Sequence, residues 1–142
     1  MMKRYMLITF VWGMLLMAGC HEVTVGYLQT KNAMYVPNTM KIRLVLDENL
    51  DAFRIHGVAP WVSPKLQGVI GTGPLLYEIE EVKATEGGNA ELFRHLLRIR
   101  GGGRMEFPLV SDITAGHYTV SVRVYNEGYS EIIKDAFTCE VI

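Results

Sequence analysis

The sequence predicts an all-β protein, in which a single antiparallel β-sandwich follows an N-terminal export segment. Apolar and polar residues alternate with a period of two in several short runs, as in strands that bury one face. Residues with β-branched or aromatic side chains are concentrated in those runs. Gly, Pro and Asn separate the runs at short intervals, and this spacing is typical of a sandwich.

Each expected strand is bounded by a turn signal. The run at 117–125 places Tyr118 and three valines on one face, which we assign to the core. The Tyr118 hydroxyl is a candidate for a hydrogen bond to a backbone group at a corner of the sandwich. The sequence Asn-Glu-Gly at 126–128 predicts a hairpin turn, and Cys139 is expected to be a small buried side chain in the last strand. The alternation predicts strands at residues 23–27, 40–46, 75–79, 117–125 and 129–134.

Two segments leave alternatives open. Residues 90–100 (AELFRHLLRIR) show both helical spacing and alternation, and we favour a strand because context often overrides propensity. Residues 47–51 form either a loop or one helical turn. Their acidic side chains lack the internal glycine of an EF-hand, so we expect a solvated loop there and no calcium site.

The first 19 residues have the composition of an export signal. Lys3 and Arg4 are followed by 14 mostly apolar residues without charge, 5–18. A helix of that length spans about 21 Å, which is short for a bilayer core of about 30 Å. The remaining chain carries 12 basic and 15 acidic residues, a net charge of −3, so nucleic acid is not an expected partner.

The export segment ends in Leu-Met-Ala-Gly-Cys at 16–20, which resembles the lipobox of bacterial lipoproteins. The resemblance implies cleavage after Gly19 and a diacylglycerol on the Cys20 thiol, with a further acyl chain on the new amine in Gram-negative bacteria. It also implies location in the outer membrane, since no Asp follows Cys20, with either face of that membrane possible. We therefore expect a signal peptide at 1–19, a lipidated N-terminus and short tether at 20–22, and one domain at 23–142.

Two stretches of the expected domain resemble known modules. GVIGTGPLLYEI at 68–79 and ITAGHYTVSVRVYNEGY at 113–129 are similar to strands of bacterial immunoglobulin-like, polycystic-kidney-disease-like and cadherin-like repeats. The second stretch is also similar to prealbumin-like modules. The resemblance implies an immunoglobulin-like sandwich and indicates architecture without specifying function.

No catalytic or metal motif stands out. The four histidines, at 21, 56, 95 and 117, lack the spacing of a zinc helix, and no Gly-x-Ser-x-Gly elbow is present. With Cys20 assigned to lipid, Cys139 has no partner for an intramolecular disulfide. We expect no enzyme activity, no metal and no cofactor other than the covalent lipid.

Three aromatic residues are candidate ligand-binding residues. Trp61 lies between Pro60 and Pro64, where it either stacks on a sugar ring or plugs the end of the sandwich. Tyr125 and Tyr129 flank the predicted hairpin turn, as an exposed tip or as a cross-strand pair. The expected function is contact with an envelope protein, as an accessory subunit of an outer-membrane or surface adhesive assembly. The alternative is a small surface glycan-binding lipoprotein that uses Trp61.

Overall fold

The computed structural model describes residues 2–6 and 26–142. Residues 2–6 form a short helical turn. The expected cleavage site, Cys20, the tether at 20–22 and most of the first predicted strand lie outside the described residues. The rest of the expected domain contains nine strands and few helices, which confirms the all-β class.

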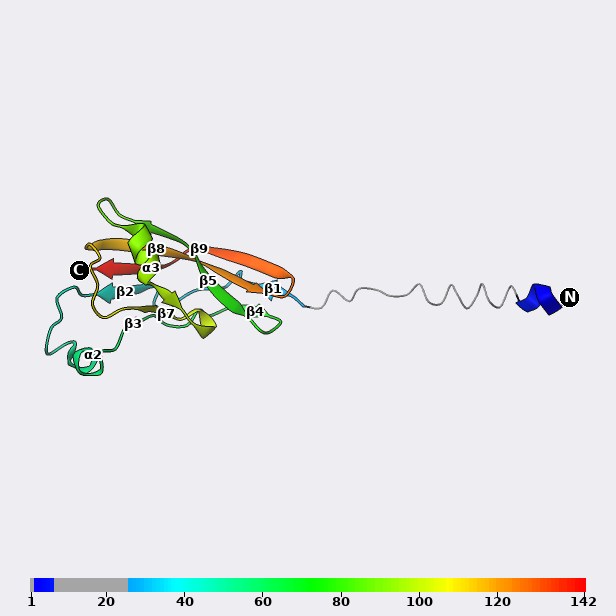
Figure 1. The fold of residues 1–142 in the computed structure, drawn as a ribbon, viewed down its shortest axis with the longest axis horizontal. Helices are drawn as coiled ribbons and strands as arrows, with labels where there is room; N and C mark the ends of the chain where they lie inside the picture. The colour runs from blue at the N-terminus through cyan, green and yellow to red at the C-terminus, as the bar shows by residue number, and fades with distance from the viewer. Residues whose placement is uncertain (1, 7–25) are drawn as a thin grey trace.

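A four-stranded sheet in the order β2-β9-β8-β5 forms the largest part of the fold (Figure 1). Its long central hairpin turns through two residues at Glu127 and Gly128, as predicted. The pairs β5–β8 and β8–β9 are antiparallel, whereas β2 runs parallel to β9. The expectation of antiparallel pairing throughout is wrong at this edge of the sheet. The strands are β2 (Thr39–Ile42), β5 (Leu76–Ala84), β8 (Gly116–Asn126) and β9 (Tyr129–Val141).

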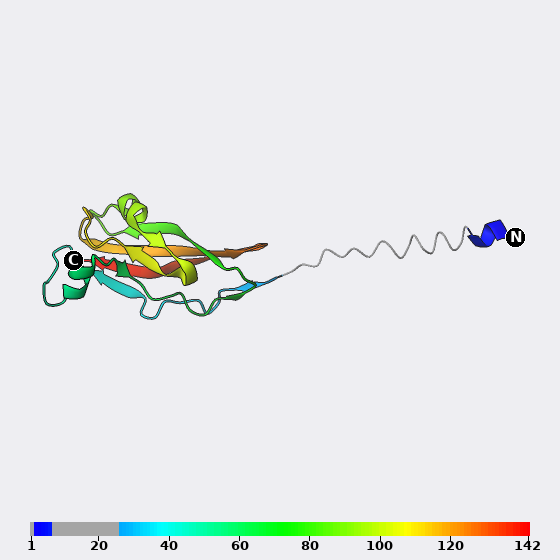
Figure 2. The same cartoon turned by 60° about the horizontal axis from the view of Figure 1, so that its bottom comes forward.

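Five shorter strands form two smaller sheets. One has the order β3-β7-β6, and the other pairs β1 with β4. In both views of the ribbon the long hairpin extends along the length of the domain, and the short strands lie beside it (Figures 1 and 2). They are β1 (Leu28–Gln29), β3 (Trp61–Val62), β4 (Ile70–Gly71), β6 (Arg98–Ile99) and β7 (Met105–Phe107).

One core joins the sheets. Tyr118, Val120, Val122 and Val124 are fully buried, which confirms the face assigned from the alternation. The Tyr118 hydroxyl donates to the carbonyl oxygen of Thr114 at 2.8 Å, the backbone bond expected at a corner. Cys139 is also fully buried in β9 without a disulfide partner, and burial raises the pKa of its thiol to about 12. The core positions of the hairpin were therefore predictable from parity alone.

The prediction of a strand at 90–100 is wrong for most of this segment. Residues Ala90–Leu96 form helix α3, and only Arg98–Ile99 form a strand, β6. The Asn89 side chain caps the helix by accepting the backbone N–H of Leu92 at 2.9 Å. Phe93 is fully buried, with ring centroids 4.7 Å from Phe107 and 4.3 Å from Tyr118. The Asn89 cap and the burial of Phe93 stabilise a helix here, although alternate residues of this segment are apolar as in a strand.

The strand predicted at 40–46 ends early, at Ile42. Ile42 is buried, but Leu44 and Val45 beyond it are exposed. The backbone N–H of Leu44 still donates to the carbonyl oxygen of Ile142 at 2.7 Å, and beyond Leu44 the segment up to β3 forms a structure that the alternation did not predict. The run predicted at 129–134, in contrast, continues without a break to Val141, so that it includes Cys139, which the sequence placed in the last strand.

Candidate functional site

The connection between β2 and β3, residues 43–60, exposes several large apolar side chains. We call it the β2–β3 loop. It contains helix α2 (Ala52–Gly57), in which no residue is buried. α2 lies at the end of the domain opposite to β1 (Figure 1). Because the described domain begins beside β1, this loop is at the end remote from that start.

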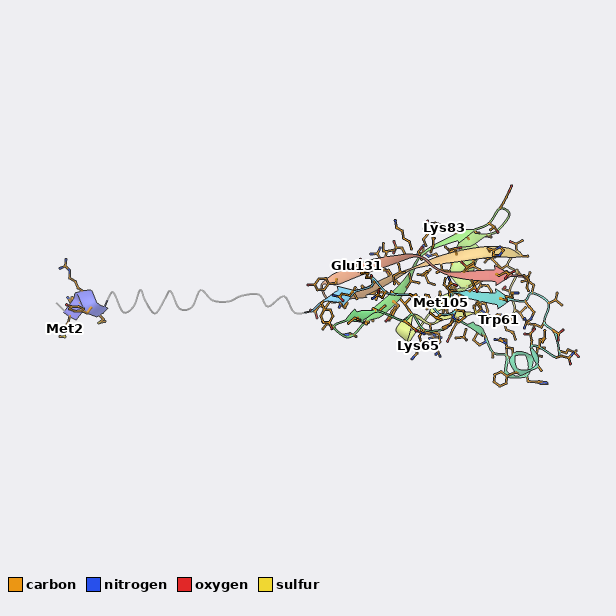
Figure 3. The ribbon with its side chains drawn as sticks, turned by 180° about the vertical axis from the view of Figure 1, so that it is seen from behind. Met2, Trp61, Lys65, Lys83, Met105 and Glu131 are labelled. Atoms are coloured by element: carbon orange, nitrogen blue, oxygen red, sulfur yellow. The ribbon has the colours of Figure 1, made fainter. Side chains whose placement is uncertain are left out.

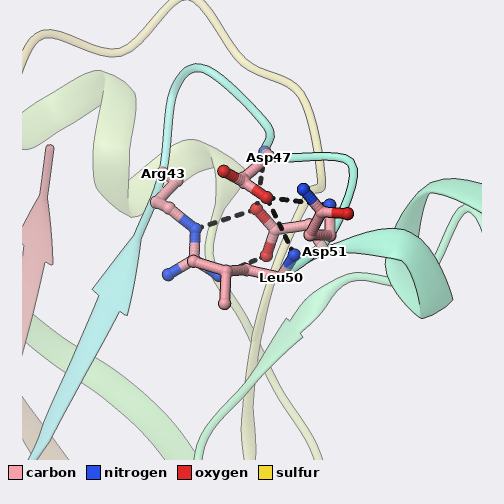
Figure 4. A network of polar contacts seen from close by, with 5 residues as sticks. Arg43, Asp47, Leu50 and Asp51 are labelled. Atoms are coloured by element: carbon pink, nitrogen blue, oxygen red, sulfur yellow. Dashed lines mark hydrogen bonds and ion pairs between the residues drawn. The ribbon is translucent and has the colours of Figure 1, made fainter.

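A buried carboxylate organises the β2–β3 loop (Figure 4). Asp51 is fully buried, and its oxygens accept hydrogen bonds from Arg43 Nε at 2.8 Å and from Arg43 Nη2. Asp51 also accepts the backbone N–H of Asp47 at 3.0 Å, and Asp47 Oδ1 in turn accepts the backbone N–H groups of Asn49 and Leu50. One carboxylate thus fastens both ends of the turn to the end of β2.

The expectation of a fully solvated acidic loop is corrected by this arrangement. Asp47 and Glu48 are exposed as expected, whereas Asp51 is not. The hydrogen bond from Arg43 lowers the pKa of Asp51 to about 2, although burial acts in the opposite direction. A buried charge with its hydrogen-bond partners in place is a structural anchor, and breaking it leaves the partner uncompensated.

Replacing Asp51 with Asn is expected to remove an acid-sensitive part of the stability. The folded-state pKa of about 2 lies below the ordinary value of 3.8, so the ionised form stabilises the fold fully above the ordinary value. That stabilisation is lost as the pH falls through the folded-state value. Urea unfolding across this acid range should show the free energies of unfolding of the two proteins converging as the pH falls. A constant difference across the range would contradict this assignment.

Trp61 is buried beneath this loop. Only 3% of its surface is exposed, and the guanidinium carbon of Arg54 lies 4.3 Å from its ring centroid. The guanidinium of Arg43 lies on the ring as well, at 5.3 Å. Both contacts have cation–π geometry. Trp61 therefore fixes the loop to the body of the domain. Of its two expected placements the ring has the buried one and not that of an exposed stacking platform, because two arginines and the core cover it.

The anchored loop presents apolar side chains to solvent. Val58 lies just after α2 with φ of 48°, a left-handed conformation that is uncommon for a β-branched residue. Strained backbone of this kind persists where the surrounding structure holds it, and it is often found at functional sites. The exposed fractions are 85% for Val45, 71% for Leu50, 85% for Phe53 and 76% for Val58. Four large apolar side chains are thus exposed within one loop, and exposed apolar surface is found at protein-binding sites.

Tyr125 and Tyr129 lie near the turn of the long hairpin, away from Trp61, and the alternative of a cross-strand pair is wrong, because Tyr125 lies opposite Ser130 and Tyr129 opposite Asn126. They line an open hollow of about 560 Å³ at the turn of the long hairpin. Arg123 lies in the same hollow, held by Glu78 at 3.1 Å and by Glu80 at 2.8 Å. Figure 3 shows Trp61 near the α2 end and Glu131, on β9, toward the other end. The three candidate aromatics thus do not form one surface.

A second hollow, of about 400 Å³, brings a histidine and a carboxylate together. His95, Arg98 and Glu106 line it, along with Pro60 and other residues. Glu106 forms an ion pair with Arg100 at 3.2 Å, and no Ser, Thr or Cys is among the lining residues. The arrangement therefore lacks a nucleophile for acyl transfer.

The described ranges, 2–6 and 26–142, contain no group of three or more His, Cys, Asp or Glu side chains that could hold a metal ion. Within these same ranges no helix has the length and apolar character needed to cross a membrane. Comparison with protein-family models, with curated proteins and with solved structures gave no match.

The sequence reasoning missed the β2–β3 loop as a site. Its signals were present: Asp51 precedes a short helical segment, and Gly57 ends it. Phe53 and Leu50 flank that helix start in a segment rich in charge. A run of apolar residues outside any strand pattern, between two strands, is the feature that could have marked it.

Proposed function

We propose that this chain is a non-enzymatic lipoprotein of the bacterial cell envelope that binds another envelope protein through the β2–β3 loop. Lipid on Cys20 holds it in the outer membrane, and the domain is an immunoglobulin-like sandwich. The sandwich is supported by the core shared between the sheets and by the Tyr118 corner bond. The anchor is supported by the lipobox resemblance at 16–20.

The observation that carries the proposal is the contrast within the β2–β3 loop. A buried ion pair and the Arg54–Trp61 stack hold the loop in place, yet its apolar side chains are directed away from the core. Folding alone gains nothing from exposing Phe53, since burial of such a side chain is worth about 1.5–3 kcal/mol. A rigid, exposed aromatic side chain is the kind of anchor that contributes most in protein interfaces.

The loop also exposes negative charge. Asp47 and Glu48 are exposed and form no ion pair with any other residue of the described chain. The structure favours a partner with an apolar groove bordered by basic side chains, because opposite charges at the rim guide association. The contact is then expected to weaken at high salt.

Site-specific photo-crosslinking tests this function. A photoreactive residue at Phe53 in the living cell should give a discrete crosslinked protein, and the same residue at Ile132, which is 41% exposed on β9, should not. With the captured partner purified, Phe53→Ala should weaken binding by at least about 2 kcal/mol, or about 30-fold in Kd. Equal crosslinking at both positions, or unchanged affinity of Phe53→Ala, would contradict a contact through the loop.

A second candidate function, glycan binding, is favoured by the hollow at the hairpin turn. Tyr125 and Tyr129 provide aromatic surfaces there, and Arg123 and Glu78 provide polar groups of the kind that fix a sugar ring. Affinity electrophoresis in gels that contain envelope polysaccharide should show retardation of the wild type and its loss in Tyr125→Ala. Equal mobility of the two proteins in every glycan tested would leave protein contact as the single proposal.

A further inference from the structure

The end of the domain opposite to α2 is formed by three segments far apart in the sequence. The Asn126 side chain joins them, because its Nδ2 donates to the carbonyl oxygens of Tyr27 at 3.0 Å and of Thr72 at 3.1 Å. The backbone N–H of Thr72 also donates to Tyr27 at 3.0 Å. Figures 1 and 2 both show β1, β4 and the turn of the β8–β9 hairpin at this end.

Apolar and aromatic side chains are exposed around this end. We call them the β1-end patch: Tyr27, Ile70, Leu76 and Tyr129, with exposed fractions of 52%, 53%, 46% and 38%. Charged side chains also lie at this end, among them the ion pair of Arg123 with Glu78 in the hollow beside Tyr129. Glu127 is exposed in the hairpin turn, and Lys31 follows β1. Tyrosine has an apolar ring and a polar hydroxyl, and it is enriched where proteins meet the interface between lipid and water.

Chain length limits how far this end can be from an anchored lipid. Five residues separate Cys20 from Gly26, where the described domain begins, and the six steps from Cys20 to Gly26 reach at most about 22 Å at about 3.6 Å per step. The eleven residues of β8 extend about 36 Å at about 3.3 Å per residue, from the hairpin turn toward the opposite end. A short tether also keeps the local concentration of lipid high, so that even a weak contact is populated.

We infer that the β1-end patch rests against the surface of the bilayer, so that the domain stands on this end and directs the β2–β3 loop away from the membrane. The contact rests on the proposed function, since it requires the lipid on Cys20. It is mainly apolar, because Glu127 and Lys31 are opposite in charge and Arg123 beside Tyr129 is already paired with Glu78. It is therefore expected to be the same on neutral and anionic vesicles and to persist at high salt.

A tryptophan reporter in the patch tests the contact. The lipidated protein is reconstituted into phosphatidylcholine vesicles, with and without lipid that is brominated in the acyl chains and quenches nearby tryptophan. Ile70→Trp is the reporter, because Ile70 is exposed and is far from Cys20 in the sequence. We expect its emission to lose intensity in brominated vesicles. The unsubstituted protein, whose single tryptophan outside the export segment is Trp61 at the α2 end, should keep its emission.

A pair of charge variants links the quenching to the patch. Leu76→Asp, in the Ile70→Trp background, should reduce the quenching, whereas Val45→Asp at the opposite end should leave it unchanged. Loss of intensity that is equal for the reporter and for Trp61, or no loss for the reporter, would overturn the upright orientation.

Detergent partitioning and the intact mass of the protein show separately whether the lipid is attached. Lipid present without quenching refutes only the contact, and absence of lipid refutes both the contact and the anchor.

Discussion

Replacing Trp61 with Ala is expected to lower the free energy of unfolding by about 3–5 kcal/mol, the range for truncating a large buried aromatic side chain. Trp61 is 97% buried, since only 3% of its surface is exposed, and it pairs with Phe107 across β3 and β7. Its removal also takes away the ring on which Arg54 and Arg43 lie. The β2–β3 loop would then lose one of the two contacts that hold it.

Urea unfolding followed by circular dichroism measures this effect without relying on tryptophan emission. Trp61→Phe should recover much of the loss, because a smaller aromatic ring still fills part of the site and still accepts a cation. Phe53→Ala is the matched control: its side chain is 85% exposed, so the expected change is within about 0.5 kcal/mol. If Trp61→Ala lowered the free energy of unfolding by no more than the control does, the ring would not be part of the core.

The comparison of sequence with structure shows where local patterns suffice. Parity located the buried side chains of β8, including Val120 and Val122, because alternate residues of a strand face the same side, whereas the shift in register between these two valines was not predicted. The hairpin turn at 127–128 followed from its glycine, which has φ of 99°. These features depend on neighbours in the sequence or on a repeating period, and both are visible in the chain itself.

The features that failed have more than one cause. Residues 90–96 are helical because Asn89 caps them and because Phe93 fits between Phe107 and Tyr118, so the helical spacing visible in the sequence should have been preferred to the alternation. The parallel edge between β2 and β9 requires a long connection, and its register cannot be read from either strand. Asp51 resembled any acidic loop residue until Arg43 was placed against it. The candidate site was missed because its two anchors, Arg43–Asp51 and Arg54–Trp61, join side chains at spacings that follow no helix or strand period, and because its exposed residues carry no motif.

Replacing Cys20 with Ala is expected to abolish acylation and retention in the outer membrane. Each buried methylene of an acyl chain contributes about 0.8 kcal/mol, and two or more chains hold a protein at a membrane stably, whereas one chain does not. No other part of the described chain offers a comparable anchor, since the β1-end patch exposes only a few side chains and residues 26–142 contain no membrane-spanning helix. Retention in the outer membrane would therefore be lost with the thiol.

The second cysteine makes the test specific. Metabolic labelling with an alkyne fatty acid should mark the wild type and Cys139→Ala equally, because the Cys139 thiol is buried, protonated and part of the core. Cys20→Ala should carry no label and should migrate as the longer precursor, since cleavage after Gly19 follows lipid attachment in the proposed pathway. Label that persists in Cys20→Ala, or an unchanged distribution between membrane fractions, would refute the lipid anchor. The protein contact at Phe53 would remain open to its own test, because the β2–β3 loop is built entirely from the domain.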